Sequence, residues 1–416
     1  MIFKLFKLSI HKYTTLSSLA FAIFRTNFMK KVNIPQITGK IAKDIRQGYT
    51  GGAVDMYIPE GRDIKCLDVN SLYPSQMESR LMPIGKPTYF EGDIRKIDIN
   101  AFGFFYCEII APDDILHPII QTRVKIHGVN KTIAPIGTWE DMLFSEELYN
   151  AENYGYKFKV IWGYKFESEN IFENYVDFLY KIRNQYPKSD PMNFITKILM
   201  NSLYGRFGMD DNFANIEVIH KDYYSDFENK YLDHIIDKIK LDDHYIISFT
   251  SLEEVSSDHN VSVGVAAAIT AYSRIHMSFF KNNPNIKLYY TDTDSIYTDS
   301  DIDPSLIDPK KLGKLKVEHI CRKAIFLAAK LYCLDTNDNK TIKKVKGLKD
   351  TNDLNFSDFE NLLTKNFMLK KSHNKWIRNL SESKINILKQ IYSIKVTDLF
   401  LLTHYFHYKL IFVYYL

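Results

Sequence analysis

Three segments of the chain place an acidic or polar residue directly beside a run of apolar residues. In the first, Ile64–Val69 has the length and composition of a short buried strand. Ser71 suits the cap of a helix that begins near Leu72 and tolerates Pro74 in its first turn. The pattern predicts a strand, a turn and a helix, with Asp68 near the end of the strand and free backbone N–H groups beside it.

The second segment favours a helix. Good helix formers run from Phe194 to Tyr204, and Gly205 is suited to end the helix. Lys197, Asn201 and Tyr204 are spaced so that they share one face. A cation, an amide and an aromatic ring in one row match a phosphate, a sugar and a base. A solvated helix face with a half-buried tyrosine explains the same row.

The third segment predicts a β-hairpin. Two apolar runs flank Thr291-Asp292-Thr293-Asp294, so the acids lie at the tip. Neighbouring acids in a turn splay apart, and most D-x-D sequences are ordinary surface turns. Asp292 and Asp294 therefore need not both be ligands.

Composition narrows the class of protein. The 416 residues are 45% hydrophobic and 25% charged, which is the ordinary globular mix. Four cysteines lie far apart in the chain, which argues against a disulfide scaffold and against a zinc ribbon.

Charge is unevenly distributed, although the net charge is only +4. Residues 310–349 carry twelve Lys/Arg and three acids, whereas residues 210–260 carry thirteen acids and four Lys. Most charge runs are solvated faces. A basic block would also suit a phosphate backbone.

The two ends of the chain are basic and apolar, respectively. Residues 1–43 carry eight Lys/Arg and no acid, which fits either a mitochondrial transit peptide or a basic surface helix. Residues 399–416 are very apolar, but His404, His407 and Lys409 interrupt them. We therefore expect no stable membrane insertion.

Asp68 and Asp292 could converge as a pair of carboxylates from distant segments. Paired acids occur in glycosidases, but those enzymes need no helix that presents lysine, asparagine and tyrosine. Carboxylates also hold Mg²⁺ against phosphates, and two such ions would activate a sugar hydroxyl and stabilise a leaving pyrophosphate. This chemistry favours a nucleotidyl transferase.

Several motifs resemble those of family B DNA polymerases, in the protein-primed branch of small-bacteriophage and linear mitochondrial plasmid enzymes. D-V-N-S-L-Y-P at Asp68–Pro74, K-I-L-M-N-S-L-Y-G at Lys197–Gly205 and Y-T-D-T-D-S at Tyr290–Ser295 resemble polymerase motifs A, B and C. Four further segments resemble, in order, the Y-x-G-G, T-x-x-A/G-R and K-x-Y motifs and a thumb segment: Tyr49–Gly52, Thr270–Arg274, Lys330–Tyr332 and Lys344–Leu348.

The resemblance implies a role for each matching residue. Asp68, Asp292 and the Val69 carbonyl would hold two Mg²⁺ ions, or Mn²⁺, with Asp294 as a second acid of motif C. The nucleotide would be bound by Ser71, Leu72, Tyr73, Arg183, Lys197, Asn201 and Tyr204. Within this set the Tyr73 ring would exclude a ribose 2′-hydroxyl. DNA would be contacted by Tyr49, Gly51, Gly52, Thr270, Arg274, Lys330, Tyr332 and Lys346.

The fold implied is α/β (α+β), a right-hand polymerase with an antiparallel palm sheet, helical fingers and a small thumb. We expect a basic segment at 1–48, a palm at 49–315, a thumb at 316–380 and an unassigned apolar tail at 381–416. Within the palm range we expect an insertion like the terminal-protein region at about 90–174, fingers at about 175–209 and a second insertion at about 210–262. The 48 residues before Tyr49 cannot hold an exonuclease domain, so no proofreading is expected.

The resulting hypothesis is a DNA-directed DNA polymerase that uses dNTPs and a DNA primer-template. Its primer would be provided by a terminal protein, and it would copy a linear DNA element in mitochondria. The alternative is an inactive, truncated polymerase that only binds DNA or a terminal protein. A reverse transcriptase or RNA polymerase is less favoured, because Thr293 separates two acids that are usually adjacent in reverse transcriptases.

Overall fold

The computed structural model describes residues 2–13, 15–29, 32–126, 128–209, 215–249, 262–348, 350–364, 367–379 and 384–395. The predicted apolar tail therefore lies outside the described residues from 396 onward, as do parts of the predicted second insertion.

A seven-stranded antiparallel sheet forms the centre of the molecule, in the order β1-β12-β13-β2-β14-β15-β16. Its strands are β1 (Val54–Met56), β2 (Glu60–Val69), β12 (Leu288–Asp292), β13 (Ser295–Thr298), β14 (Leu315–Ala328), β15 (Leu331–Thr336) and β16 (Thr341–Val345). The predicted strand at Ile64–Val69 is the second half of β2, and the predicted acidic hairpin is confirmed as β12 and β13.

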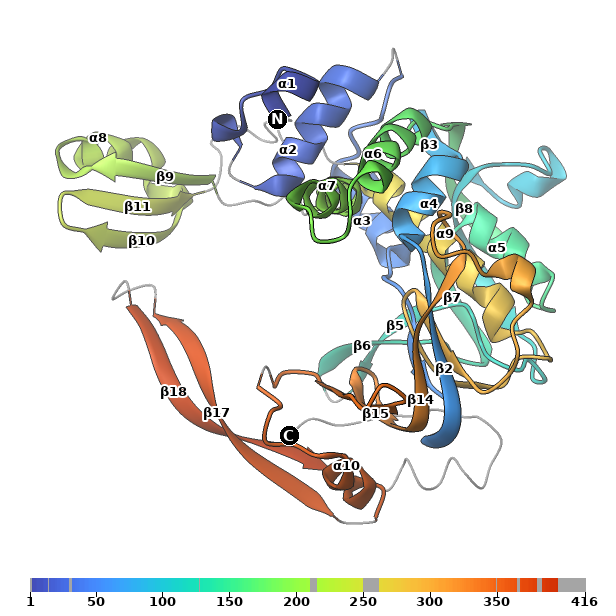
Figure 1. Cartoon of the computed structure of the whole chain (residues 1–416). Helices are drawn as coiled ribbons and strands as arrows, with labels where there is room; N and C mark the ends of the chain where they lie inside the picture. Colours follow the sequence, from blue (N-terminus) through green and yellow to red (C-terminus); the bar gives the residue numbers. More distant parts are fainter. Residues whose placement is uncertain are drawn as a thin grey trace.

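Four helices gather above this sheet in Figure 1: α4 (Leu72–Ser79), α6 (Glu173–Gln185), α7 (Pro191–Phe207) and α9 (Val263–Lys281). The helix predicted near Leu72 is confirmed as α4. The prediction that Gly205 ends the next helix is wrong. The helix α7 continues to Phe207, whose ring is buried in the core, and Gly208 is the cap.

The N-terminal segment contributes to the core. It forms α1 (Ile2–Phe6), η1 (Ile10–Lys12), α2 (Leu16–Ile23), the π-helical turn η2 (Phe24–Phe28) and α3 (Gly39–Gly48). Ile23 and Phe24 are fully buried, and the Phe24 ring lies 6.2 Å from that of Phe207 on α7. The apolar face of α2 is therefore built into the body of the protein.

The expected first insertion folds around a second sheet, of order β3-β8-β4-β7. Its elements are β3 (Met82–Glu91), η3 (Ile94–Lys96), β4 (Gly103–Ala111), β5 (Thr122–Ile126), β6 (Val129–Ile133), β7 (Gly137–Phe144), α5 (Ser145–Glu152) and β8 (Lys157–Glu169). Strands β5 and β6 form a separate hairpin.

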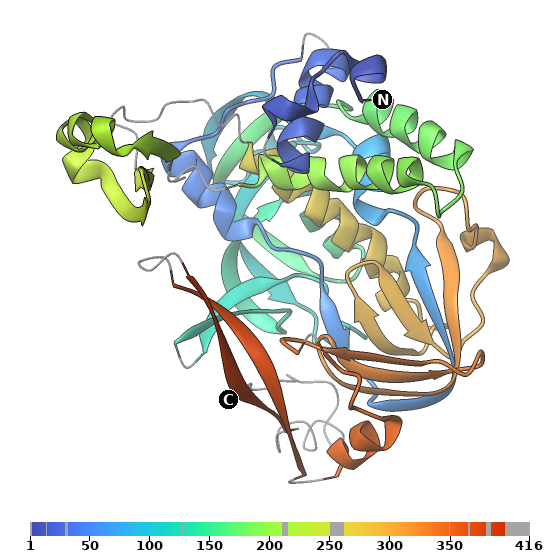
Figure 2. The same ribbon diagram turned by 60° about the vertical axis from the view of Figure 1, so that its left-hand side comes forward.

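The range expected to be the second insertion, at about 210–262, contains a small folded unit. Figures 1 and 2 both show it standing apart from the main body. It comprises β9 (Asn215–His220), α8 (Lys221–Tyr231), η4 (Leu232–His234), β10 (Ile235–Leu241) and β11 (His244–Phe249). Phe227 of α8 packs edge-on against Phe249 of β11, so apolar contacts hold the unit together.

The boundary expected at residue 316 falls inside the central sheet. Strands β14 to β16 extend that sheet, because β14 pairs with β2 along most of its length. Beyond the sheet lie α10 (Phe356–Leu362) and the long hairpin of β17 (Met368–Asn379) and β18 (Lys384–Lys395), seen apart from the sheet in Figure 2. A short turn, η6 (Pro304–Leu306), precedes β14. Within the part of the chain that the structure describes, no helix has the length and apolarity to cross a membrane.

Candidate active site

The two predicted metal-binding acids lie in one row across the central sheet. Asp292 at the end of β12 pairs with Ser295 of β13, and Ser295 pairs in turn with Asp68 of β2. Directly paired residues of antiparallel strands point to the same face of a sheet. Since one strand separates them, the Cα atoms of the two acids are roughly 10 Å apart, at about 4.8 Å per strand. We call Asp68 and Asp292 the acid row.

Asp294 is a third acid beside this row. Thr293 turns the hairpin in a left-handed conformation, with φ of 56°. The Asp294 carbonyl then accepts a 2.7 Å hydrogen bond from the Val69 N–H, which ties the turn to β2. Burial, together with the negative charges of Asp68 and Asp292, raises the pKa of Asp294 to about 7. The site therefore holds more negative charge than its surroundings stabilise.

Each acid of the row is paired with a lysine. Both carboxylate oxygens of Asp292 accept hydrogen bonds from the Lys330 ammonium, at 2.7 and 2.8 Å. Asp68 Oδ1 lies 2.9 Å from Lys316 Nζ, which also lies 3.1 Å from Glu318. Burial raises the pKa of the Asp68 carboxyl above its ordinary value, although Lys316 and the more distant charge of Lys197 pull it the other way.

The acid row fits a pair of hard divalent ions. Within the described residues, no three His, Cys, Asp or Glu side chains are close enough together to form a ready-made metal cluster. Two ions about 4 Å apart, with oxygen ligands about 2 Å away, would span most of a 10 Å gap between Cα atoms. Burial is the largest cause of the raised pKa of Asp294, and the negative charges of Asp68 and Asp292 add to it; a bound cation would offset that added repulsion.

The start of α4 combines an N-terminal helix cap with a nearby arginine, which suits an anion. Ser71 caps the helix in a left-handed conformation, and its side chain caps no helical N–H group. Its hydroxyl instead accepts a 3.0 Å hydrogen bond from Arg183 of α6. Asn193 of α7 accepts from Arg183 Nε at 3.4 Å and donates to the Arg183 carbonyl at 3.1 Å. The structure thus brings Arg183 to the end of β2 and to the buried first residue of α4, Leu72.

The predicted face of α7 turns away from the core. Lys197 is exposed and Asn201 and Tyr204 are half-buried, while Leu199 and Leu203 between them are buried. The Tyr204 ring lies edge-on to that of Tyr73 on α4, with ring centroids 4.7 Å apart. Burial raises the pKa of Tyr73 to about 12, so its hydroxyl stays protonated at neutral pH.

The Tyr49–Gly52 loop packs on the acidic hairpin. A Cβ atom at Gly52 would lie 2.6 Å from the Thr293 side chain, so only glycine allows this approach. The Thr293 N–H also donates to the Ala53 carbonyl at 2.8 Å. Gly51 itself has open space where a side chain would be.

Arg274 is buried and contacts the same loop from the interior of the protein. It donates to the carbonyls of Thr50 and Gly51 at 2.7 and 3.1 Å, and it forms two hydrogen bonds with Glu147 at 2.6 and 2.7 Å. Thr270, one turn earlier, is buried and donates to a helix carbonyl. Both residues were expected to contact DNA, whereas the structure places them in the interior, where Arg274 positions the Tyr49–Gly52 loop.

The Lys330–Tyr332 segment curls back over the acidic hairpin. The Lys330 N–H donates to the Tyr290 hydroxyl at 2.7 Å, which fixes this turn above β12. Tyr332 is buried, and its hydroxyl pairs with that of Tyr297 at 3.3 Å. Lys346 is exposed, and its N–H donates to the Lys330 carbonyl at 3.0 Å. Tyr332 was expected to contact the primer, but in the structure it packs in the aromatic core beneath Lys330.

Sequence reasoning missed Lys316, Glu318 and Glu147. Lys316 and Glu318 are two residues apart on β14, which was a usable signal, and their charged groups lie 3.1 Å apart. The place of Lys316 opposite Asp68 depends on the long-range pairing of β14 with β2 and has no local signature. Glu147 lies in the first insertion and gives no sign of its contact with Arg274.

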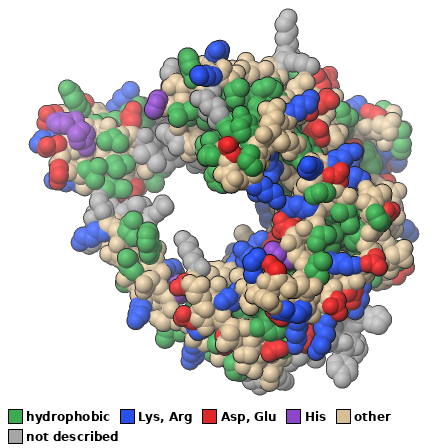
Figure 3. All heavy atoms as spheres, in the orientation of Figure 1, with side chains coloured by type: hydrophobic (Ala, Val, Ile, Leu, Met, Phe, Trp, Pro, Cys, Tyr) green, Lys and Arg blue, Asp and Glu red, His purple; other side chains and the backbone are tan. Residues whose placement is uncertain are grey.

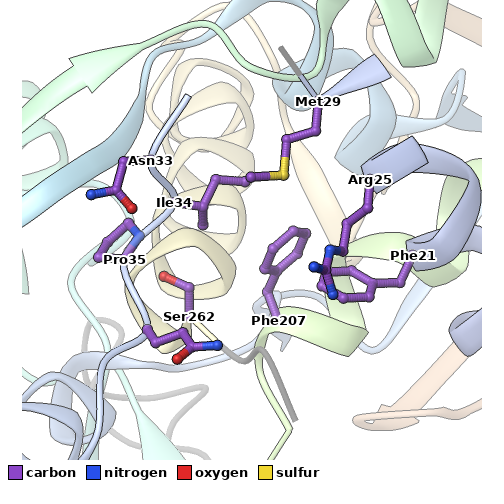
Figure 4. Close-up of a pocket in the computed structure, with 9 residues that line it drawn as sticks. Phe21, Arg25, Met29, Asn33, Ile34, Pro35, Phe207 and Ser262 are labelled. Atoms are coloured by element: carbon purple, nitrogen blue, oxygen red, sulfur yellow. The ribbon is translucent and has the colours of Figure 1, made fainter. Parts of the chain in front are cut away.

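A cavity of about 350 Å³ lies between the N-terminal helices and α7 (Figure 4). Phe21, Met29 and Phe207 form much of its wall, with Arg25 and Ser262 at its edge. None of its lining residues belongs to the predicted site.

Comparison with known proteins adds a family match. The family model described as DNA polymerase type B, organellar and viral, matches residues 1–286. A probable DNA polymerase of Ascobolus immersus is 40% identical over 415 residues, which cover 96% of this chain. The chain spans 33% of that relative's length.

Solved structures match the architecture. The phi29 DNA polymerase in an orthorhombic crystal form has a TM-score of 0.71 at 22% identity, covering 95% of this chain and 70% of that one. The phi29 polymerase with primer-template DNA and incoming nucleotide substrates has a TM-score of 0.68 at 22% identity, covering 92% of this chain and 68% of that one. The expected right-hand fold is confirmed by this likeness.

Proposed function

This chain belongs to the organellar and viral type B DNA polymerases, and from that membership we propose that it is a DNA-directed DNA polymerase. It would add dNTPs to a primer 3′-hydroxyl. The single observation that carries the proposal is the register that aligns Asp292, Ser295 and Asp68 across the sheet. This alignment presents two carboxylates on one face, beside a helix start that is suited to a triphosphate.

The acids would hold the divalent ions, and the surrounding residues would bind the nucleotide. When bound, two Mg²⁺ ions activate the attacking hydroxyl and stabilise the leaving pyrophosphate. The backbone N–H groups of Ser71 and Leu72 would receive phosphate oxygens. Arg183 and Lys197 would neutralise the triphosphate as charge develops on it.

The rings of Tyr73 and Tyr204 would border the sugar and base. Because the two rings pack edge to face, a ribose 2′-hydroxyl beside Tyr73 would meet a ring that is fixed in place. Asn201, on the same face of α7, would lie near the template base.

The partners that we propose are a DNA primer-template and a terminal protein that provides the priming hydroxyl. Figure 3 shows an opening in one face of the molecule with Lys and Arg side chains on part of its rim, which supports a phosphate-bearing partner. We also propose that the chain acts on a linear element in mitochondria, because the matching family model describes organellar and viral polymerases. The expected lack of proofreading stays a prediction.

Primer extension tests the proposal. The purified chain with primed DNA template, dNTPs and Mg²⁺ or Mn²⁺ should extend the primer. Asp292→Asn should lower the rate at least about 10³-fold, since it removes a metal ligand that stabilises transition-state charge.

Asp301→Asn is the matched control for charge. Asp301 follows the same hairpin, is fully exposed and pairs with Lys65, so its substitution should leave extension unchanged. If the Asp292→Asn variant still extends the primer, the assignment of the metal site is wrong. DNA retention by the wild-type chain without incorporation in either metal would favour the inactive alternative, and copying of an RNA template instead of DNA would indicate a reverse transcriptase.

A further inference from the structure

Each carboxylate of the acid row forms an ion pair with a lysine of the chain. Lys330 meets both oxygens of Asp292, and Lys316 meets Asp68 together with Glu318. Hard divalent ions would use the same carboxylate oxygens. An ammonium group and a metal ion therefore compete for one set of ligands.

The position of Lys330 is built into the backbone. Its φ of 59° is left-handed, which is uncommon for a residue with a side chain. The Tyr290 hydroxyl accepts its N–H at 2.7 Å, and its carbonyl accepts the Lys346 N–H at 3.0 Å. Two hydrogen bonds thus hold a strained turn directly above Asp292.

The position of Lys316 is set by strand register. Lys316 lies opposite Asp68 in the β2–β14 pairing, so both side chains point to the face of the acid row. Its side chain is 28% exposed, against 51% for Lys330. Neither ammonium group is sealed from solvent, so each can leave its carboxylate without a large desolvation cost.

Building on the proposed polymerase function, we propose that Lys330 and Lys316 are tethered counterions that divalent ions displace on binding. Each displaced ammonium group needs a new anionic partner. The nearest anions in a working complex are the phosphates of the primer and of the incoming nucleotide. Metal binding therefore strengthens phosphate binding, and phosphate binding strengthens metal binding by the same factor.

Arg183 shows the same arrangement at the start of α4. Arg183 donates to the Ser71 hydroxyl at 3.0 Å. Two groups suited to a triphosphate thus satisfy each other, as the lysines and acids do. In both places, groups suited to ligands form contacts with each other that ligands would replace.

Mn²⁺ binding to the full chain without DNA tests the proposal, with free Mn²⁺ followed by electron paramagnetic resonance. Lys330→Met and Lys316→Met should each bind Mn²⁺ at least about fivefold more tightly than wild type, because a competing cation is gone. Lys330→Arg keeps the charge and can pair with both oxygens of Asp292, so it should bind Mn²⁺ no more tightly than wild type.

The sheet offers a matched control for each lysine. Lys323 lies on the same strand as Lys316 and also bridges two acids, Glu60 at 2.9 Å and Glu360 at 2.7 Å. Lys340 is an exposed lysine at the next turn and pairs with Asp338 at 2.6 Å. Lys323→Met and Lys340→Met should leave Mn²⁺ affinity unchanged.

The coupling is measured through DNA affinity. Fluorescence anisotropy with labelled primer-template should show that Mn²⁺ strengthens DNA binding by wild type several-fold more than it does for Lys330→Met. Unchanged Mn²⁺ affinity in both lysine variants overturns the proposal, and so does an equal gain in the control variants.

The result separates this inference from the proposed function. If the wild-type chain extends primers but the lysine variants bind Mn²⁺ as wild type does, the proposed function stands and the counterion role is wrong. If the lysine variants bind Mn²⁺ more tightly but the wild-type chain never extends a primer, the counterion role stands and the polymerase assignment is wrong.

Discussion

Two ion pairs of similar chemistry lie in opposite surroundings in this molecule. Arg274 and Glu147 meet in the interior, with side chains 5% and 6% exposed. Lys330 and Asp292 meet at the acid row, with side chains 51% and 19% exposed. The first pair cannot be replaced by water or by a ligand, so it fixes the Tyr49–Gly52 loop. The second pair can be exchanged, so it suits the proposed metal site.

The largest expected effect tests the buried side of this comparison. Arg274→Met leaves Glu147 charged and unpaired in the interior, and it should lower the free energy of unfolding by about 3–5 kcal/mol. Urea denaturation followed by circular dichroism measures the change. The control is Arg322→Met, which removes an exposed pair with Asp335 at 2.8 Å. A loss below about 1 kcal/mol for Arg274→Met would show that burial does not decide the role of the pair.

A smaller effect is expected at Asp294, where like charges meet. Its folded-state pKa is raised to about 7, so the folded protein binds a proton that the unfolded chain has already released. Stability from this group is therefore lost as pH rises from about 4 to about 7. Asp294→Asn removes this loss. The difference in free energy of unfolding between the variant and wild type should therefore be about 2 kcal/mol more favourable to the variant at about pH 8 than at about pH 5.

Urea denaturation without divalent metal, at both pH values, measures this gain. Mg²⁺ should reduce the difference between Asp294→Asn and wild type at the higher pH, because the ion relieves the repulsion that the variant removes. A gain that does not depend on pH would contradict the assigned cause.

The smallest effect concerns the exchangeable pair itself. Lys330→Met should change the free energy of unfolding by less than about 0.5 kcal/mol, since a half-exposed pair in water contributes little. Thermal unfolding of the DNA-free protein, at low and high salt, measures it. A loss comparable to that of Arg274→Met would remove the distinction between the two pairs.

Much of the local structure could be predicted from the sequence. The strand with Asp68, the helix after it and the hairpin with Asp292 each follow from short apolar runs and turn residues. These signals lie within a dozen residues of one another, where propensity and periodicity act. The motifs also identified the face of α7 that carries Lys197 and Tyr204.

The rest depends on pairings between distant segments. Nothing local shows that β14 joins β2, so the boundary between palm and thumb was expected at residue 316 and Lys316 was overlooked. The burial of Arg274 depends on Glu147, more than a hundred residues away, which a motif cannot reveal. The acidic stretch was predicted only as an insertion, because its charge pattern gives no sign of the aromatic contacts that fold it, such as that of Phe227 with Phe249.

Strand β13 lies between β12 and β2 and so sets the distance between Asp292 and Asp68. Any insertion or deletion of one residue within Ser295–Thr298 would reverse which side chains face the acid row, because neighbouring positions alternate. The hairpin should therefore tolerate no change in length, whereas the outlying unit around β9–β11 should accept many. An insertional scan of the gene, with primer extension as the readout, should find the greatest sensitivity to length in these four residues.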